Sequence, residues 1–221
     1  ADVRYLDYYA TETHFNGHRL ILAGYDDDAV YVADTHFGGL QRLPKASFAK
    51  ARGSRVPPSF GGPNAWWEVE TPTTPPAITR DHVARAVHNA AARFFEGPTG
   101  FNGEPGFKLF LAGLPGWAGL PDAAWCARFA YQCIEKRGTG GGLFRTLYAR
   151  FLDEAATKFS DASFSQLAEL SREASHRWTA LANGFKSASE QAAPDFAALV
   201  PLARTVFDAE RRFAEQALTT K

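Results

Sequence analysis

The sequence is poor in sulfur-containing residues. Its 221 residues include no methionine and only two cysteines, Cys126 and Cys133. Two cysteines in a chain of this length do not make the disulfide framework of a small secreted domain, so we expect a reducing, cytoplasmic environment. The lack of even an initiator methionine, with strand-like sequence from Val3 onward, predicts a processed or truncated polypeptide. The alternative is methionine removal from a methionine-poor chain.

The chain also lacks an excess of charge of either sign. Lysine plus arginine and aspartate plus glutamate each number 24, so the formal net charge is zero. A neutral chain has no electrostatic footprint for nucleic acid or for an anionic membrane surface. No apolar run approaches the roughly 20 residues of a membrane span, and no signal peptide is visible. We therefore expect partners recognised by shape and local polar contacts, with neither nucleic acid nor membrane among them.

The sequence that is present has an ordinary globular composition and a pattern that divides in two. Hydrophobic residues make up 45% and charged residues 22%, enough to bury a core. The first part is rich in strand patterns, and the later part has the 3.6-residue period of amphipathic helices. The proline-rich stretch Thr71–Pro76 between them has the composition of a linker. This layout predicts an α+β chain with units over residues 1–72 and 77–221.

A β-hairpin is the clearest feature of the first unit. The stretch His18–Tyr25 reads as a strand, Asp26–Asp28 as a turn, and Val30–Asp34 as a β-branched return strand. The other elements expected here are a short strand at Val3–Leu6, a helix over Leu43–Lys50, a loop over Gly53–Pro63 and a strand over Trp66–Val69.

The second unit is expected to be all helical. Thr79 is a good N-cap for a helix that runs to about Glu96, with Asp81 and His82 in its first turn. A Gly/Pro loop over Gly97–Gly106 and a short element from Phe107 should follow. The remaining helices are expected over Pro121–Lys136, Leu143–Phe159, Phe164–Phe185 and Pro194–Leu218.

The hairpin carries the strongest chemical signal, His18 on its first strand and Asp34 at the end of its second. An acyl-transfer site needs a nucleophile, an imidazole that takes its proton, and a third group that orients the imidazole. A strict two-residue turn would place His18 and Asp34 on opposite faces, whereas a longer loop or a bulge, for which Gly24 is a plausible position, would place them on one face. The alternative is that both are polar groups at strand ends without a catalytic role.

The stretch VRYLDYYATETHFNGHRLILAGYDDDAVYVADT, residues 3–35, resembles the C-terminal part of the peptidase-like domain in the family of butirosin biosynthesis protein H. That domain has a papain-like cysteine-peptidase fold. RGTGGGLFRTLYARFLDEA, residues 137–155, and the region of Glu210 are similar to the uncharacterised helical domain that follows it in the family. The resemblance therefore spans nearly the whole chain.

The resemblance implies acyl transfer from an acyl-carrier-protein thioester to the amine of an aminoglycoside-like acceptor. By motif position His18 would be the catalytic imidazole and Asp34 its orienting carboxylate. The family's nucleophilic cysteine lies in an early segment that nothing in this chain matches, so it is expected from an upstream segment or a separate chain. No cofactor of the chain's own is implied, since the acyl donor is carried on the phosphopantetheine of the partner. The alternatives are a cysteine peptidase or amide hydrolase at the same site, and a non-catalytic binding module.

Two further groups could carry chemistry. Cys126 and Cys133 lie seven apart on a predicted helix, and we expect them to be buried, inert thiols. His14, His18, Asp34 and His36 could offer ligands to zinc, but they match no familiar ligand spacing, and we expect no metal.

The helical unit offers candidate substrate-binding residues. The loop Gly138–Gly142 precedes a helix and could hold a phosphate, although a close helix-to-helix connection is the favoured interpretation. Arg145 and Tyr148, with Arg150, could line a substrate cleft between the two units. Trp66, beside Trp67, could stack on substrate, although packing at the junction of two units is the more common role of such a pair.

Overall fold

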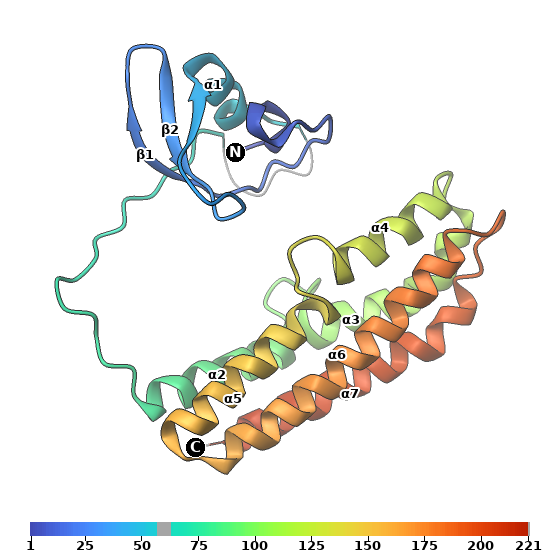
Figure 1. Ribbon diagram of the computed structural model, residues 1–221. Helices are drawn as coiled ribbons and strands as arrows, with labels where there is room; N and C mark the ends of the chain where they lie inside the picture. The colour runs from blue at the N-terminus through green and yellow to red at the C-terminus, as the bar shows by residue number, and fades with distance from the viewer. Residues whose placement is uncertain (57–62, 221) are drawn as a thin grey trace. The chain divides into compact units, whose positions relative to one another are not determined.

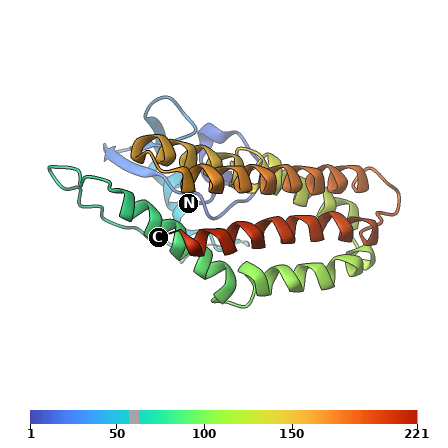
Figure 2. The ribbon, with the colours of Figure 1, turned by 90° about the horizontal axis from the view of Figure 1, so that it is seen from below.

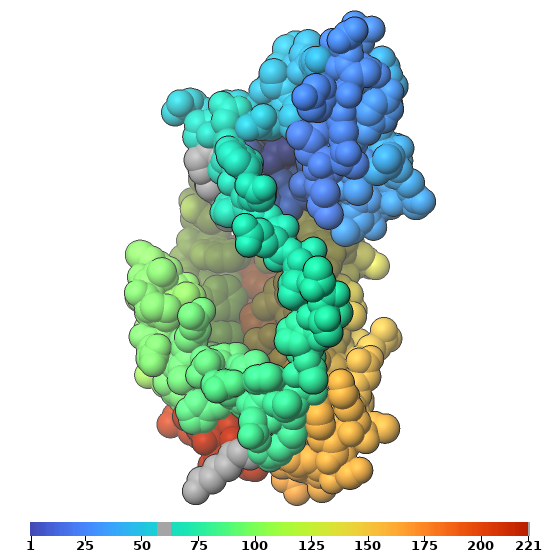
Figure 3. Space-filling view, turned by 90° about the vertical axis from the view of Figure 1, so that its left-hand side faces the viewer, coloured from blue at the N-terminus to red at the C-terminus, as the bar shows by residue number. Residues whose placement is uncertain are grey.

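The computed structural model describes residues 1–56 and 63–220 and has the α+β architecture expected (Figure 1). The chain divides into two compact units, Ala1–Pro75 and Pro76–Lys221. The boundary falls in the proline-rich stretch that the sequence predicts as a linker. Residues 63–79 are exposed throughout, and Figure 3 shows part of this segment at the surface, in the teal that the bar gives to these residue numbers.

A three-stranded antiparallel sheet forms the centre of the first unit. Its strands β1 (Ile21–Tyr25), β2 (Ala29–Ala33) and β3 (Gln41–Pro44) pair in the order β1-β2-β3. The predicted hairpin is confirmed. Its turn is closed by the Asp26 carboxylate, which accepts hydrogen bonds from the backbone N–H groups of Asp28 and Ala29.

Strand β3 was not expected, because the sequence predicts a helix from Leu43. The chain instead pairs Leu43 with Val30 of β2, and helix α1 (Lys45–Gly53) begins only after Pro44. Leu43 is fully buried. The burial of this side chain beneath the sheet decides between strand and helix here, and a short stretch of sequence does not reveal it.

One residue is inserted in the hairpin register. Ile21 pairs with Ala33 and Leu22 with Val32, but Gly24, not Ala23, pairs with Tyr31. Ala23 is therefore the extra residue of a β-bulge, next to the glycine that the sequence suggested as a bulge site.

Two predicted strands are absent from the described residues. The segment at Val3–Leu6 forms the 3-10 helix Val3–Tyr5, and a second short 3-10 helix, Asp7–Tyr9, follows it. The segment Trp66–Val69 is irregular. The first 3-10 helix begins where the Asp2 carboxylate accepts a hydrogen bond from the backbone N–H of Arg4. Such a local side-chain bond competes with strand formation. The loop predicted over Gly53–Pro63 lies partly outside the described residues.

Six α-helices make up most of the second unit in its described part. They are α2 (Arg80–Glu96), α3 (Gly103–Gly113), α4 (Ala123–Glu135), α5 (Arg145–Phe159), α6 (Ala162–Ala188) and α7 (Val200–Thr219), joined in places by the short 3-10 helices Leu114–Gly119, Gly142–Phe144 and Ala197–Leu199. Helix α2 starts and ends where the sequence predicts. Thr79 accepts from the backbone N–H of His82, and the His82 ring accepts from the backbone N–H of Thr79.

Helix α3 begins in the segment predicted as a loop. Its sequence holds three glycines and a proline, which argue against a helix. The proline lies in the first turn, where its missing N–H costs little. Phe107, Phe110 and Leu111 pack on the core of the unit, and this packing outweighs the poor helix propensity of the segment.

The long helices α6 and α7 run antiparallel and side by side (Figures 1 and 2). Around one half of the pair, α2 and α5 build a core that includes Val87, Leu152 and Phe164. Around the other half, α3 and α4 build a second core that includes Phe185 and Phe196. No helix in the described part of the chain has both the length and the apolar character that a membrane crossing needs.

Candidate functional site

The structure brings His18 and Asp34 together. The Nε2 atom of His18 lies 2.7 Å from Oδ2 of Asp34. His18 precedes β1 and Asp34 directly follows β2, so the register of the hairpin decides whether they meet. Continued past the Ile21–Ala33 pair, that register sets Asp34 opposite Leu20, on the same face as His18. Without the bulge the two side chains would face opposite sides.

The backbone of His18 is fixed by the first residue of the chain. The amino group of Ala1 donates to the carbonyl of His18 at 2.8 Å, and the N–H of His18 donates to the carbonyl of Ala1 at 3.1 Å. This reciprocal pair holds the segment before β1 extended, and it limits the positions open to the imidazole.

The carboxylate of Asp34 is buried and surrounded by donors. Besides His18 it accepts hydrogen bonds from the Tyr8 hydroxyl at 3.1 Å, the Tyr9 hydroxyl at 3.4 Å and the backbone N–H of His36 at 3.2 Å. Burial alone would raise the pKa of Asp34, but the hydrogen bonds from His18 and from the His36 backbone outweigh it, and the pKa lies below its ordinary value. Asp34 is therefore ionised at neutral pH and can hold an imidazole in one orientation.

Tyr8 and Tyr9 are site residues that the sequence did not reveal. Burial, and next the charge of Asp34, raise the pKa of Tyr9 to about 12 and that of Tyr8 further. Both phenols therefore stay protonated and donate to Asp34. In a strand, neighbouring tyrosines would face opposite sides, whereas the 3-10 helix Asp7–Tyr9 turns both toward one carboxylate. In the sequence, only the presence of two adjacent tyrosines near the hairpin could have pointed to these partners of Asp34.

The ring of His18 keeps one nitrogen for further chemistry. Its side chain is 19% exposed, and no hydrogen bond to Nδ1 is found among residues 1–56 and 63–220. If Nε2 donates its proton to Asp34, Nδ1 carries a lone pair. The arrangement can therefore accept a proton at Nδ1 while the carboxylate stabilises the resulting imidazolium.

A second histidine–aspartate pair lies in the same unit. Oδ2 of Asp2 is 2.8 Å from Nδ1 of His14 and accepts from the Ser54 hydroxyl at 2.7 Å, and Oδ1 accepts from the backbone N–H of Phe15. Asp2 thus joins the start of the chain to the segment after α1. His14 uses Asp2 and not Asp34 as its partner, and the described residues contain no group of three or more possible metal ligands.

The lowered pKa values predict how stability depends on pH. Burial opposes ionisation of Asp2, but hydrogen bonds from His14 and Ser54 bring its pKa below the ordinary value, as for Asp34. A depressed pKa stabilises the fold above the unfolded-state pKa, and this contribution disappears as the pH falls through the folded-state pKa. We expect the first unit to lose stability progressively below about pH 4.

NMR spectra recorded through an acid titration would follow this loss at the buried amides of Val30 and Val32. The Asp2→Asn variant should be less stable at neutral pH but less sensitive to acid. Asp27→Asn, at an exposed carboxyl of the hairpin turn, is the control and should leave the acid profile unchanged. An unchanged profile in Asp2→Asn as well would contradict this assignment.

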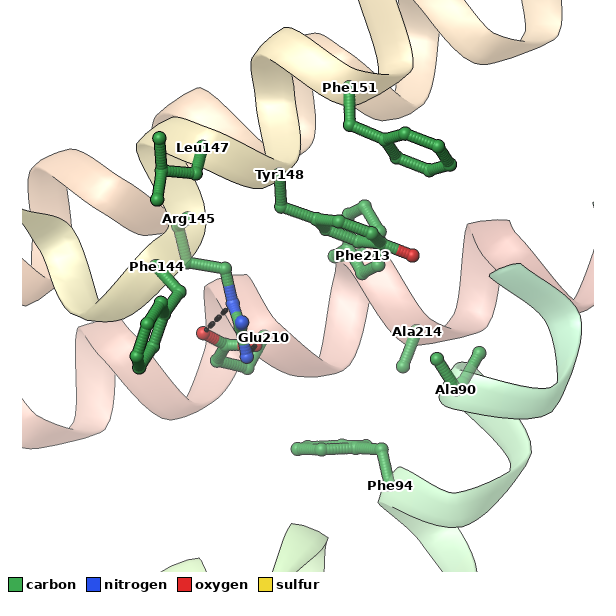
Figure 4. Close-up of a pocket in the computed structure, with 11 residues that line it drawn as sticks. Ala90, Phe94, Phe144, Arg145, Leu147, Tyr148, Phe151, Glu210, Phe213 and Ala214 are labelled. Carbon is green, nitrogen blue, oxygen red and sulfur yellow. Dashed lines mark hydrogen bonds and ion pairs between the residues drawn. The ribbon is translucent and has the colours of Figure 1, made fainter. Parts of the chain in front are cut away.

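Arg145 and Tyr148 line a cavity of about 450 Å³ in the second unit (Figure 4). The guanidinium of Arg145 binds the buried carboxylate of Glu210 through two bonds, Nε–Oε1 at 2.7 Å and Nη2–Oε2 at 2.9 Å. Trp178 Nε1 also donates to Glu210 Oε1, at 2.6 Å. Every residue that lines the cavity belongs to the second unit, and a substrate cleft between the units stays a prediction. Arg150 is exposed and is not part of the lining.

The glycine-rich loop before α5 binds a carboxylate of the chain itself. The N–H of Gly142 donates to Glu135 Oε1 at 3.2 Å, and the N–H of Gly141 donates to the Thr139 hydroxyl. A phosphate bound in this loop would need the same N–H donors, which are already used within the chain. The structure therefore favours the interpretation of the loop as a helix-to-helix connection. Leu143 and Phe144 have positive φ values of 47° and 68°, and α5 therefore begins at Arg145 and not at the predicted Leu143.

The remaining predicted residues lie apart from these clusters. Cys126 and Cys133 on α4 are partly buried, not buried as expected. The pKa of each thiol is raised, chiefly by burial, so both stay protonated at neutral pH. Trp66 is 72% exposed, and Trp67 lies under the Arg19 guanidinium. No ring contact or hydrogen bond of the Trp66 side chain is found among the described residues, and both of its expected roles, packing at the junction and stacking on substrate, stay predictions.

The chain matches one family model and no curated protein. The model is the Domain of unknown function (DUF4872), and it matches residues 46–217. This range runs from α1 almost to the end of α7, so it holds the cavity and its Arg145–Glu210 pair, whereas the hairpin with His18 and Asp34 precedes it. Because the match covers far more than half of the sequence, the chain belongs to the DUF4872 family.

Proposed function

We propose that the first unit supplies the base and the orienting carboxylate of a cysteine-dependent acyltransferase. One observation carries the proposal, the 2.7 Å contact of His18 Nε2 with the buried and ionised carboxylate of Asp34. In acyl-transfer sites such a carboxylate holds the imidazole in one tautomer and stabilises the ring when it becomes charged. The likeness of residues 3–35 to a papain-like acyltransferase family supports the same assignment.

The chemistry would proceed in two acyl transfers. Nδ1 of His18 takes the proton of a cysteine thiol, and the thiolate attacks the carbonyl carbon of a thioester donor. The C–S bond to the donor breaks, and the departing sulfur receives the proton from the imidazolium. An amine then attacks the acyl-enzyme, the new C–N bond forms, and the cysteine sulfur leaves as a thiolate. The proton lost by the amine passes to Nδ1.

The nucleophilic cysteine would come from outside residues 1–75. Residues 1–75 contain no cysteine, and the two cysteines of the second unit have raised pKa values, which disfavour the reactive thiolate. We propose that a cysteine from an upstream segment or a partner chain approaches Nδ1 of His18. The acyl donor would be a carrier-protein thioester and the acceptor a small amine such as an aminoglycoside, in the cytoplasm.

The test uses the longest natural form of the protein, or this chain mixed with a cysteine-bearing partner, and an S-acyl pantetheine thioester. Intact-mass spectrometry should show one acyl group added to the cysteine-bearing polypeptide. Addition of an amine-rich acceptor such as an aminoglycoside should discharge the acyl group to an amide. Release of the free acid at the same rate with and without amine would instead indicate a hydrolase. The absence of any acylated protein would refute the proposal and favour a binding module.

A further inference from the structure

The cavity of the second unit has the properties of a small-molecule site. It lies between α2, α5 and α7, and its volume of about 450 Å³ falls within the range of ligand pockets. In Figure 4 the Arg145–Glu210 pair lies on the side of Phe144, and the rings of Tyr148 and Phe151 lie on the other. The floor includes the buried side chains of Phe213 and Ala214.

The walls of the cavity expose apolar surface that the described part of the second unit leaves uncovered. Phe144 is 49% exposed and Phe151 is 39% exposed, although both are large aromatic side chains. Phe144 is held in the left-handed region of φ, which is uncommon for a residue with a large side chain. The preceding loop packs tightly on α6, because a Cβ on Gly142 would lie 2.0 Å from the Ser175 hydroxyl oxygen. The fold therefore maintains a strained backbone that places a phenyl ring at the rim of the cavity.

Two polar groups in the cavity have hydrogen-bonding capacity left. Arg145 binds Glu210 through Nε and Nη2, and its Nη1 donors have no acceptor in the part of the chain that the structure describes. Tyr148 stacks on Phe151 and packs edge-on against Phe213. No hydrogen bond to its hydroxyl is found among the described residues, and burial raises its pKa, so the hydroxyl stays a neutral donor.

We propose that this cavity binds an uncharged, flat aromatic compound that carries a carbonyl group. The carbonyl oxygen would accept from Arg145, and the ring system would lie between Phe94, Phe144 and Phe151. The inference does not rest on the proposed acyl transfer, because every group that it uses belongs to the second unit.

Charge balance selects a neutral ligand. Arg145 and Glu210 are the only Lys, Arg, His, Asp or Glu side chains that line the cavity among the described residues, and they neutralise one another at 2.7 Å. A ligand carboxylate would bring an uncompensated negative charge next to Glu210 and lose its hydration, whereas a carbonyl needs only the N–H donors that remain. The Arg145–Glu210 ion pair therefore favours a neutral ligand, and the aromatic walls favour a flat ring system.

The test is a fluorescence titration of the full chain with prodan, an uncharged naphthyl ketone whose emission shifts to the blue in apolar surroundings. We expect one saturable site with a blue shift. Dimethylaminonaphthalene, which lacks the ketone, should compete about tenfold less well, because it forgoes a hydrogen bond to a charged donor. Naphthoate has the same ring system but carries a carboxylate. It should displace prodan more weakly than a neutral, non-fluorescent naphthyl ketone does.

Matched variants locate the site. Phe144→Ala and Phe151→Ala should each raise the Kd for prodan about tenfold through loss of ring contact. Phe129→Ala removes a phenyl ring of similar exposure, 42%, from α4 outside the cavity, and should leave the Kd unchanged. Circular dichroism of each variant checks that it is folded.

Three results would overturn the proposal. One is the lack of saturable prodan binding, and another is equal Kd values in the Phe151→Ala and Phe129→Ala variants. The third is a dimer in sedimentation experiments that dissociates in Phe151→Ala, together with no bound dye. That result would make the aromatic surface an interface with a second copy.

Discussion

Replacement of His18 by alanine is expected to slow acyl-enzyme formation by about 10²–10⁴-fold, the usual contribution of a positioned general base. The thiol would then lose both the acceptor of its proton and the cation that favours its thiolate. The reaction should not vanish, since a cysteine is a few per cent ionised at neutral pH without assistance. The measurement is the rate of acyl addition from an S-acyl pantetheine thioester, followed by intact-mass spectrometry.

The matched control is His14→Ala, because His14 is also bound to a buried aspartate of the first unit, at 2.8 Å. Both variants remove an imidazole from a buried carboxylate and should have comparable structural costs, but only His18→Ala should lose the acylation rate. Asp34→Asn should cost up to about 10⁴-fold, because the amide can no longer hold the required tautomer. Equal rates in His18→Ala and His14→Ala would rule out a catalytic role for the pair.

The tautomer of the His18 ring can be measured on this chain without a cysteine-bearing partner. If Asp34 holds the ring as the 2.7 Å contact implies, nitrogen NMR should place the proton of the neutral His18 ring on Nε2. The Asp34→Asn variant should show a mixture of the two tautomers. A proton found on Nδ1 in the unmodified protein would leave the ring unable to act as a base at that atom.

Removal of the Arg145 charge is expected to cause a large loss of stability in the second unit. In Arg145→Met the buried carboxylate of Glu210 would keep only the hydrogen bond from Trp178, an uncompensated charge in an apolar interior. Breaking a buried ion pair in this way costs about 3–5 kcal/mol in the free energy of unfolding. Urea unfolding followed by far-ultraviolet circular dichroism reports mainly on this helical unit and measures the loss.

The double variant Arg145→Met with Glu210→Gln separates charge from packing. It removes the unpaired charge and leaves Trp178 an oxygen acceptor, so it should be more stable than Arg145→Met alone. Arg172→Met is the control, since Arg172 also binds two carboxylates, Asp153 and Glu169, but at the surface. Its loss should stay below about 1 kcal/mol. Equal losses at Arg145 and Arg172 would show that burial of Glu210 does not matter.

Much of the fold follows from patterns within a few residues. The Asp26–Asp28 turn between β-branched strands predicts the hairpin, and Thr79 with His82 predicts the start of α2. Periodicity predicts α4 to α7 to within a few residues at most ends. Local hydrogen bonds and the period of apolar residues act over one or two turns, so they can be read from the sequence.

The sequence also determined which residue types are available for chemistry, an imidazole and a carboxylate on neighbouring strands and no cysteine near them. Only the tertiary structure decided that they meet. The bulge at Ala23 sets His18 and Asp34 on one face, the 3-10 turn brings Tyr8 and Tyr9 to the same carboxylate, and Glu210 reaches Arg145 across 65 positions of sequence. Each of these depends on which surfaces are buried together, an energy summed over distant residues that no short stretch of sequence contains.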